Sequence, residues 1–446
     1  MSTQSAIKPV LPAGIRDYLP GDMIPRQKML DTIRKTFESF GFNPLDTPGL
    51  EREEVLTGGD PSFKMQIFRA RLRDGEEDLA LRFDLTVPLA RVVATYQSDL
   101  DRPFKRYQVG KVWRGEKPQA GRFREFVQFD ADIVGSARTM ADAEIIALMY
   151  QTMVALGFSR CVIKVNNRKL LNGLAGYVGF SQEQIPTVLR LIDKLDRLGW
   201  DNIAGELADM VGLTVEQLAS LKRFLDLRED SVDRLLSSLN DLMGNAEEAS
   251  SGIRELSEIR DHLSALGVPS ENWEIDLSVA RGLGYYTGPV FETILTDLPS
   301  IGSVFSGGRF DGLVARFGAA SMPATGASIG VDRLFSAMEK LSLLPKQATL
   351  TQVLVLNFST ECEKRCQELA TQLRLGGINT EIYLGKEVTL AGQIAYAVRQ
   401  SVPAVLIMGG NELASGTCQV KDMATRSQAE VSFDQVGIRV SEILSR

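Results

Sequence analysis

Apolar residues near the start of the chain recur at the spacing of a helix. Leu30, Ile33, Phe37 and Phe40 are three or four positions apart, which places them on one face of an α-helix. Gly41 follows directly, and glycine commonly ends a helix because it adopts the left-handed conformation without strain. An amphipathic helix with its apolar stripe against a core is therefore predicted here.

Strand-like segments dominate the next part of the chain. Residues 67–73 and 78–84 flank Asp74-Gly75, a pair that favours a tight turn, so they are predicted to form a β-hairpin. Residues 104–114 and 122–134 read as two longer strands joined by a polar loop. Short connections of this kind join antiparallel strands, so an antiparallel sheet is expected.

A long helical stretch follows these strands. From about 168 to 265 the pattern is almost wholly helical, and Ser181-x-x-Gln184 and Thr214-x-x-Gln217 have the spacing of capping boxes. Strand character returns at 273–279 and 289–295. The helical stretch is therefore predicted to be an insertion between strands of one sheet.

Beyond residue 351 the pattern changes to regular alternation of short apolar strands and helices, which is typical of a compact α/β domain with a mixed sheet. The expected strands are 353–357, 380–384, 404–408 and 417–422, and the expected helices are 361–375, 391–400 and 433–444. The whole chain is thus predicted to be α+β. One domain spans 1–345, a linker spans 346–351, and a second domain spans 352–446.

The composition is typical of an ordinary soluble protein, with 446 residues, 44% of them apolar and 24% charged. No apolar run approaches the roughly 18–20 residues of a membrane helix, and the start of the chain lacks the pattern of a signal peptide. We therefore expect a cytoplasmic protein with no membrane partner. The cysteines agree with a reducing compartment, lack the paired spacing of a zinc site, and are expected to be buried thiols: Cys161, Cys362, Cys366 and Cys418.

Histidine occurs once, as His262, in a segment with a helical pattern. Serine-triad hydrolysis, histidine-ligated metals and histidine general-base catalysis are therefore excluded by composition. Any catalysis must depend on arginine, carboxylates, tyrosine and a bound cation.

Charge is distributed unevenly along the chain. The net charge is −7, yet residues 102–124 contain eight lysines and arginines and a single acid, Glu116. This local excess predicts a place where polyphosphate or nucleic acid binds.

Three arginines stand beside glycine-rich or aromatic segments at predicted strand or helix ends: Arg114, Arg281 and Arg333. Activation of a carboxylate by ATP places charge on the α-phosphate and on the leaving diphosphate. A guanidinium group stabilises such charge because it binds phosphate bidentately and stays ionised at cellular pH. Any one arginine could be a solvated surface charge, but three in such places favour an adenylate-forming site.

A phosphate-binding glycine loop is only weakly indicated. Ser306-Gly307-Gly308-Arg309 precedes a predicted helix, but glycine pairs often mark simple turns. The chain has no P-loop motif and no G-x-G-x-x-G after a strand. ATP is therefore expected to be held by side chains on the antiparallel sheet.

Polar residues on the predicted strands suggest a site for a cationic substrate. Asp84 and Thr86 are predicted to share one strand face, and residues 128, 130 and 132, which include Gln128 and Asp132, to share another. Carboxylates on mostly apolar strands need a cation or a donor, which a substrate ammonium or ring N–H supplies. Salt bridges to the nearby arginines are the alternative. Tyr285-Tyr286, between glycines, would line an aromatic pocket or serve only in packing.

These residues resemble the motifs of histidyl-tRNA synthetases, which are class II aminoacyl-tRNA synthetases. The similarity covers nearly the whole chain and includes an Arg-Gly-Leu-x-Tyr-Tyr element that is specific to histidine enzymes and their paralogues. The matching segments are Gly14–Pro20, Gly41…Pro48…Glu51 (motif 1), Asp84-Leu85-Thr86, Arg114…Arg122-Phe-Arg-Glu-Phe (motif 2), Arg281–Gly288, Gly307–Leu313, Gly330–Leu334 (motif 3) and Gly416–Asp422. The resemblance implies an antiparallel-sheet catalytic domain with a helical insertion, and a C-terminal anticodon-binding domain.

The resemblance also implies roles for individual residues. Those implied to bind histidine are Asp84, Leu85, Thr86, Arg114, Gln128, Asp132, Arg281, Tyr285 and Tyr286. Those implied to bind ATP are Arg114, Arg122, Arg281 and Arg333, with Arg114 and Arg281 acting in catalysis. Lys117 and Gln119 would contact the acceptor end of tRNA(His). Mg²⁺ would be held mainly by the ATP phosphates, and motif 1 would form a homodimer.

Two other interpretations remain open from the sequence. A catalytically inactive paralogue would bind histidine as a regulatory subunit, without needing the three arginines or the C-terminal domain. An RNA-binding scaffold would explain the basic segment, but it would not explain the acids on the strand faces.

Overall fold

The computed structural model describes residues 7–58, 67–117, 123–280, 285–344 and 348–445. The chain divides into two compact units. One consists of Met1–Arg16 and Met29–Leu343, and the other of Asp17–Lys28 and Leu344–Arg446. Among the described residues, no helix has the length and apolarity that crossing a bilayer requires.

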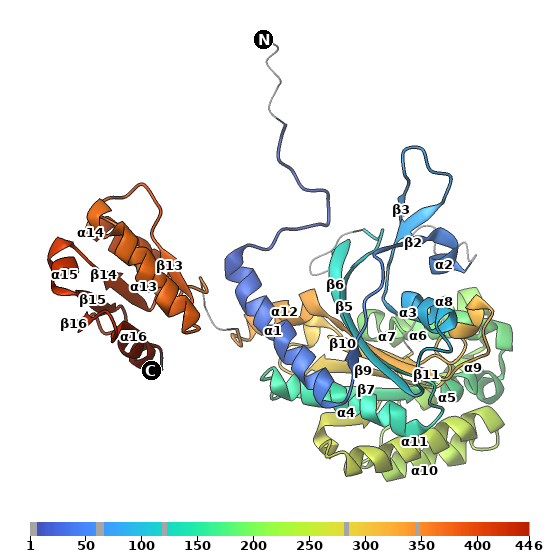
Figure 1. The fold of residues 1–446 in the computed structure, drawn as a ribbon. Helices are drawn as coiled ribbons and strands as arrows, with labels where there is room; N and C mark the ends of the chain where they lie inside the picture. The colour runs from blue at the N-terminus through green and yellow to red at the C-terminus, as the bar shows by residue number, and fades with distance from the viewer. Residues whose placement is uncertain (1–6, 59–66, 118–122, 281–284, 345–347, 446) are drawn as a thin grey trace. The chain divides into compact units, whose positions relative to one another are not determined.

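An eight-stranded sheet forms the centre of the first unit, in the order β1-β5-β6-β11-β10-β9-β7-β8 (Figure 1). Its strands are β1 (Asn43–Pro44), β5 (Phe104–Trp113), β6 (Glu125–Val134), β7 (Cys161–Asn167), β8 (Trp273–Ile275), β9 (Pro289–Leu295), β10 (Phe305–Arg309) and β11 (Ala324–Gly330). The inner pairs are antiparallel, and only the edge pairs β1–β5 and β7–β8 are parallel. The predicted antiparallel sheet is therefore confirmed.

One face of this sheet is apolar and covered by helices. Phe37 of α1 (Pro20–Ser39) packs edge-on against Phe129 of β6, with ring centres 5.0 Å apart, and stacks near Phe305 of β10 at 6.2 Å. Helix α4 (Thr139–Ala155) packs on the same sheet, where Glu144 pairs with Lys105 at 2.5 Å. The predicted Leu30–Phe40 stripe thus faces the core, since Ile33 and Phe37 are fully buried.

A smaller sheet stands beside the large one. It contains β2 (Leu50–Arg52), β4 (Leu79–Leu81) and β3 (Phe68–Ala70), all antiparallel. Phe68 pairs with Leu81 and Ala70 with Leu79, so the hairpin predicted around Asp74-Gly75 is confirmed. Helices α2 (Glu53–Thr57) and α3 (Thr86–Thr95) accompany this sheet, and α12 (Val331–Lys340) follows β11.

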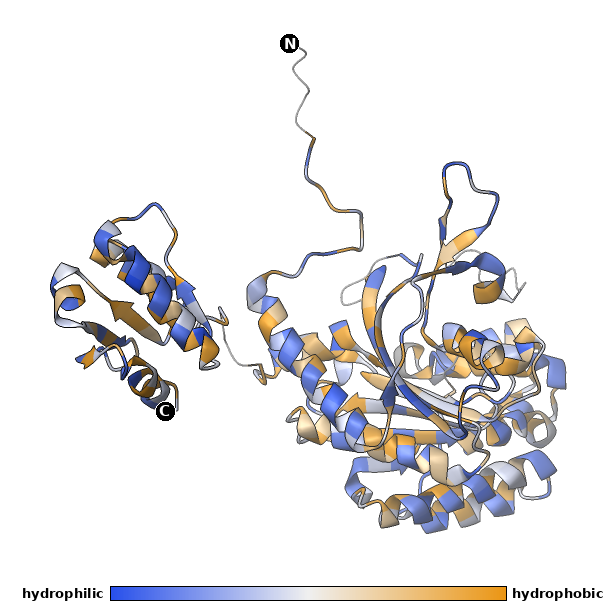
Figure 2. Ribbon diagram, in the orientation of Figure 1, coloured by the Kyte–Doolittle hydropathy of each residue, from blue (hydrophilic) through white to orange (hydrophobic). Residues whose placement is uncertain are grey.

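Between β7 and β8 the chain is helical, as its pattern predicts. The helices are α5 (Arg168–Asn172), α6 (Ile185–Ile192), α7 (Leu195–Leu198), α8 (Trp200–Val211), α9 (Val215–Leu225), α10 (Val232–Met243) and α11 (Glu247–Ala265). The Thr214 hydroxyl accepts from the Gln217 amide, and the Gln217 side chain accepts from the Thr214 amide, which completes the predicted capping box. Helix α11 packs on α4 and α5. The helices carry hydrophilic and hydrophobic bands, as expected for helices with one buried side (Figure 2).

The second unit contains a five-stranded mixed sheet in the order β13-β12-β14-β15-β16. Its strands are β12 (Val353–Val355), β13 (Thr380–Ile382), β14 (Ala404–Ile407), β15 (Thr417–Asp422) and β16 (Gln428–Ser432), and its helices are α13 (Glu363–Leu375), α14 (Leu390–Arg399), α15 (Gly410–Ser415) and α16 (Val436–Leu444). Leu369 of α13 and Val440 of α16 pack on one side of the sheet, and Ala397 of α14 packs on the other. The sequence pattern missed β16 and α15. The four cysteines are buried and unpaired with one another, as predicted.

Two local predictions are wrong. Asp84 and Thr86 do not share a strand, because β4 ends at Leu81 and Thr86 is the first residue of α3. Asp84 instead accepts a hydrogen bond at 3.1 Å from the Val87 amide of that helix. Ser306–Arg309 is not a loop before a helix but lies within β10, paired on both sides. Glycines there reflect close packing, since a β-carbon on Gly307 would stand 2.0 Å from the carbonyl oxygen of Gly326.

Candidate active site

The face of the central sheet that α1 and α4 leave uncovered carries polar residues. Along β6, Gln128, Asp130 and Asp132 alternate with apolar residues and line one cavity. Their neighbours on β11 are small, because Gly330, Ser328 and Gly326 stand opposite them in that order. The cavity above the sheet therefore exists because β6 carries polar side chains on this face, whereas the facing positions of β11 carry only glycine and serine.

Gly326 shows how closely this arrangement is fitted. A β-carbon at this position would lie 2.0 Å from Asp132 Oδ1, so any side chain would displace the carboxylate. On β10, a β-carbon on Gly308 would meet the Tyr286 ring at 2.9 Å. These glycines give the acid and the tyrosine the room they occupy.

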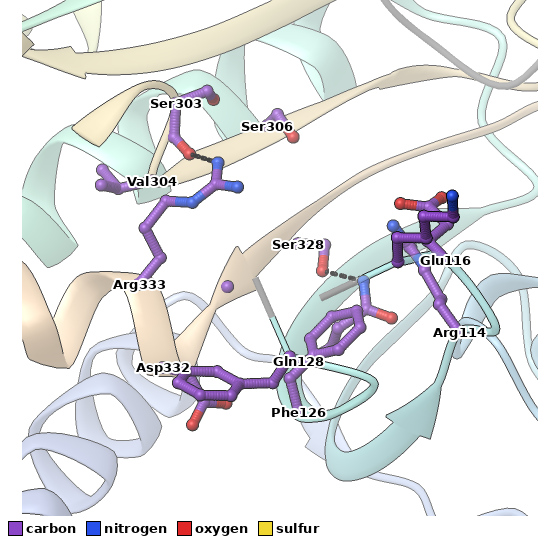
Figure 3. A pocket seen from close by; sticks show the side chains of 13 residues that line it. Arg114, Glu116, Phe126, Gln128, Ser303, Val304, Ser306, Ser328, Asp332 and Arg333 are labelled. Atoms are coloured by element: carbon purple, nitrogen blue, oxygen red, sulfur yellow. Dashed lines mark hydrogen bonds between the residues drawn. The ribbon is translucent and has the colours of Figure 1, made fainter. Parts of the chain in front are cut away.

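One end of the site is a cavity of about 310 Å³ lined by basic and aromatic side chains. Figure 3 shows Arg114 and Arg333 on opposite sides of it, with Gln128 and Ser328 between them. Arg114 Nε donates to the Phe83 carbonyl at 3.1 Å, and its guanidinium carbon lies 5.1 Å from the centre of the Phe126 ring. Arg333 donates to the Ser303 carbonyl at 2.5 Å.

The position of Arg333 depends on the start of α12. Asp332, the second residue of that helix, accepts from the Val127 amide at 2.8 Å and pairs with Arg16 at 3.4 Å. These bonds fix α12 against β6, so Arg333 is held at the end of the polar strand face. The structure therefore brings Arg114 and Arg333 to one cavity.

The other end is a cavity of about 660 Å³ lined by acids and tyrosines. The predicted residues Asp84, Thr86, Asp132, Tyr285 and Tyr286 all line it. The two tyrosine rings meet edge to face, with centres 5.0 Å apart. Residues that line both cavities are Arg114, Gln128, Ser306 and Ser328, so the two ends form one continuous site.

A buried arginine lies among the acids. Arg106 of β5 is fully buried, and its guanidinium forms an ion pair with Asp132 at 2.7 Å and donates to the Leu85 carbonyl at 3.2 Å. The structural salt bridge that sequence analysis offered as an alternative thus exists for Asp132. It does not remove Asp132 from the cavity, because the same carboxylate lines it.

Several hydrogen-bond acceptors in the acidic cavity have no donor in the described part of the chain. Among the described residues, Asp84 Oδ2, Gln128 Oε1 and Asp130 Oδ1 are buried and have no hydrogen-bond partner. Burial raises the pKa of Asp84, Asp130 and Asp132, which Arg106 partly opposes. Buried acceptors without partners cost free energy, so this cavity is suited to a ligand that brings a cation and N–H donors.

The tyrosines act as neutral groups here. Burial, together with the nearby acids, raises the pKa of both Tyr285 and Tyr286 above the ordinary range. Each therefore keeps its hydroxyl proton at cellular pH and can donate or accept one hydrogen bond.

Four sequence-predicted residues do not line the described cavities or lie outside the described residues. Leu85 is fully buried and contributes its carbonyl to Arg106. Arg122, Gln119 and Arg281 fall outside the residues that the structure describes, so their positions remain predictions. Lys117 is exposed and lines the arginine end.

The structure adds residues that the sequence analysis did not select. Strand alternation places position 130 on the same face as Gln128 and Asp132, but it assigns no role to Asp130, which the structure shows lining the cavity. Arg106 could have been found as the residue opposite Asp132 on the neighbouring strand. Arg190 and Lys194, from and just after α6, also line the acidic cavity, and no local signal marks them.

A metal ion held by the protein alone requires several ligand side chains arranged around one point. Among the described ranges there is no group of three or more histidine, cysteine or carboxylate side chains placed to hold an ion.

Comparisons with known proteins cover almost the full chain. A family model described as "Histidyl-tRNA synthetase" matches residues 14–334, and one described as "Anticodon binding domain" matches 352–443. The chain is 41% identical over 428 residues to the "Histidine--tRNA ligase" of Rhodopirellula baltica, covering 96% of each sequence.

Solved structures are also similar. A histidyl-tRNA synthetase from Nostoc sp. PCC 7120 has a TM-score of 0.87 and 34% identity, with 98% of this chain and 100% of that chain covered. A protein from Bacillus halodurans, titled as an ATP phosphoribosyltransferase regulatory subunit/histidyl-tRNA synthetase, has a TM-score of 0.74 and 25% identity, with 88% and 97% covered.

Proposed function

The chain belongs to the histidyl-tRNA synthetase family, and from this premise we propose that it is a histidine–tRNA ligase. It activates L-histidine with ATP to histidyl-adenylate and then transfers histidine to the 3′ end of tRNA(His). The observation that supports this most strongly is the continuous site, which joins an acidic end to an arginine end through Arg114 and Gln128.

The acidic end binds histidine. Asp84 and Gln128 offer partnerless oxygens to the ammonium group, and Thr86 lies beside them. Asp132 and the two tyrosines face the imidazole ring, where they accept or donate hydrogen bonds to its nitrogens. Phenylalanine or leucine would leave these buried groups without partners, which is a strong basis for rejecting them.

The arginine end binds ATP and stabilises the charge that develops during activation. A histidine carboxylate oxygen attacks the α-phosphorus, a new C–O–P linkage forms, and the bond to the β-phosphate oxygen breaks to release diphosphate. Arg114, at the junction of the cavities, and Arg281 hold the carboxylate and the α-phosphate. Arg333 and Arg122 bind the remainder of the nucleotide, and Phe126 provides a flat apolar surface for the adenine ring.

Magnesium enters this scheme with the nucleotide. Glu116 and Asp332 are the carboxylates that line the arginine cavity, and they are too few for an all-protein cage. Mg²⁺ held mainly by the ATP phosphates fits this lining and supplies charge neutralisation to the diphosphate.

We also assign the domains of the chain and its contacts with tRNA. We assign residues 1–345 to the catalytic domain, with a helical insertion at about 168–265, residues 346–351 to a linker, and residues 352–446 to an anticodon-binding domain. Lys117 and Gln119 contact the acceptor end. The enzyme works in the cytoplasm as a homodimer.

Two assays on the full chain test the proposal. Histidine-dependent exchange of diphosphate into ATP and charging of tRNA(His) should both occur. Histidine binding without exchange would contradict the proposal and favour a regulatory, catalytically inactive paralogue.

A further inference from the structure

The acidic end of the site carries more negative charge than one histidine ammonium balances. Asp84, Asp130 and Asp132 are all buried there, and Arg106 is the buried cation that contacts one of them. When all four are ionised, two negative charges are left in excess. The substrate ammonium offsets one, and the substrate carboxylate is matched by Arg114 at the junction, so one negative charge remains.

Asp130 is the acid that nothing else accounts for. Arg106 contacts Asp132, and the Val87 amide donates to Asp84. The Ser328 hydroxyl, which accepts from Gln128 at 2.7 Å, favours the ionised form of Asp130 and so lowers its pKa. Asp130 is 2% exposed and lines the cavity. Its Oδ1 is buried and has no hydrogen-bond partner among the described residues.

We propose that Asp130 is a specificity-determining residue that shares one proton with the imidazole ring of bound histidine, opposite Asp132. This rests on the proposed histidine site. A neutral imidazole has one N–H and one acceptor nitrogen, and cannot donate to two carboxylates at once. With one added proton, one ring nitrogen donates a hydrogen bond to Asp132. The other ring nitrogen and Asp130 share the added proton, and the net charge of the acidic end is then zero.

The groups that face Asp130 support this placement of the proton. Arg106, from β5, favours the ionised form, while Asp132 and Asp84 disfavour it, and burial raises the pKa of Asp130 further. Tyr285 and Tyr286 adjoin the same acids and remain neutral. Arg82 also interacts electrostatically with Asp130. Two further cations and two further acids line the same cavity, and their formal charges cancel: Arg190, Lys194, Asp193 and Glu292.

Binding of histidine should therefore be coupled to the uptake of one proton. Above neutral pH the free imidazole is neutral, so forming the shared proton requires uptake of one proton from solvent. The affinity for histidine should then fall as pH rises, by up to roughly tenfold per pH unit once free Asp130 is ionised. A site that binds the neutral ring without sharing takes up no proton, and its affinity is flat in this range.

Calorimetric titration of the full-length protein with L-histidine at about pH 8, in two buffers of different ionisation enthalpy, counts the protons directly. About one proton taken up by the unaltered protein, and close to none by Asp130→Asn, is the expected result. Binding without uptake in the unaltered protein overturns the inference but leaves the proposed function intact. Uptake that persists in Asp130→Asn also overturns it, because the proton then resides elsewhere. No binding at all overturns the proposed function itself.

A second ligand tests the same point without a variant that might fold poorly. 1,2,4-Triazole-3-alanine has nearly the shape of histidine, but its ring is far less basic. The unaltered protein should bind it roughly ten- to a hundredfold more weakly than histidine, since a charge-assisted hydrogen bond is lost. Equal affinity for the two ligands contradicts the shared proton.

Discussion

The two ends of the candidate active site differ in how deeply their charged side chains are buried. At the acidic end, charges are buried, and the Arg106 and Asp132 side chains are 0% and 4% exposed. At the other end, Arg114 and Arg333 are half-buried and are anchored through backbone carbonyls. Buried charges discriminate because an unsuitable ligand leaves them unpaired. Half-exposed arginines cost less desolvation and suit phosphate groups that change during the reaction. In the proposed site, the acidic end therefore provides selectivity and the arginine end provides rate.

The largest effect should come from breaking the buried pair. Arg106→Met leaves the Asp132 carboxylate buried without its partner, which should lower the free energy of unfolding by about 3–5 kcal/mol. Urea unfolding of the full chain measures this. Arg52→Met is the matched control, because Arg52 pairs with Glu77 at 2.8 Å but both side chains are more than half exposed. An equally small change in the free energy of unfolding of both variants would show that burial does not make the Arg106–Asp132 pair more important for stability than the exposed pair.

The next effect concerns the arginine end. Arg114→Ala should reduce kcat for diphosphate exchange on the order of 10²–10³-fold, because one preorganised cation is removed from the developing charge. Arg281→Ala should do the same. Lys111→Ala is the control, since Lys111 is on the same strand as Arg106 but points to solvent, where it pairs with Glu125. An Arg114→Ala enzyme with unchanged kcat would remove Arg114 from the chemistry.

The pH dependence of stability should contain a contribution from Asp84 at the acidic end. The folded-state pKa of Asp84 is raised by burial, so without ligand this carboxyl binds more protons in the folded protein than in the unfolded chain. Stability therefore falls as pH rises from about 4 toward the raised folded value, by at most about 1.4 kcal/mol per pH unit for one group.

Asp84→Asn should flatten this slope, and it should also reduce the stabilisation that saturating histidine gives at neutral pH. Urea unfolding at several pH values, with and without histidine, measures both. A slope that is identical in the variant would mean that Asp84 titrates as it does in the unfolded chain.

The smallest effect is expected at the exposed rim. Lys117 is exposed, so Lys117→Ala should raise the KM for tRNA by roughly two- to fivefold, with a smaller change in exchange. Charging and exchange assays on one preparation compare the two. A larger loss in exchange than in charging would place Lys117 in ATP binding instead.

The sequence predicted those features that depend on a local period. Alternation along β6 placed Gln128 and Asp132 on one face, and helical spacing placed Ile33 and Phe37 in the core. Local period failed at Thr86, because two residues after Asp84 the chain turns into α3, and apolar alternation does not mark that change.

Features that depend on long-range pairing were not predictable from local pattern. Gly326 and Gly307 are needed because of contacts between neighbouring strands. A β-carbon on Gly326 would meet Asp132, and one on Gly307 would meet the backbone of Gly326. Arg190 and Lys194 reach the cavity only because the helices between β7 and β8 fold back beside it. The resemblance to a known family supplied the roles of separate motifs that the residues alone left open.

A crystal structure of the full chain with a non-hydrolysable histidyl-adenylate analogue tests the division of the site most directly. The imidazole should lie between Asp130, Asp132 and the two tyrosines, with the phosphate at Arg114 and the nucleoside between Phe126 and Arg333. An analogue bound in the reverse direction, or with its ring outside the acidic cavity, would contradict the assignment of the two ends.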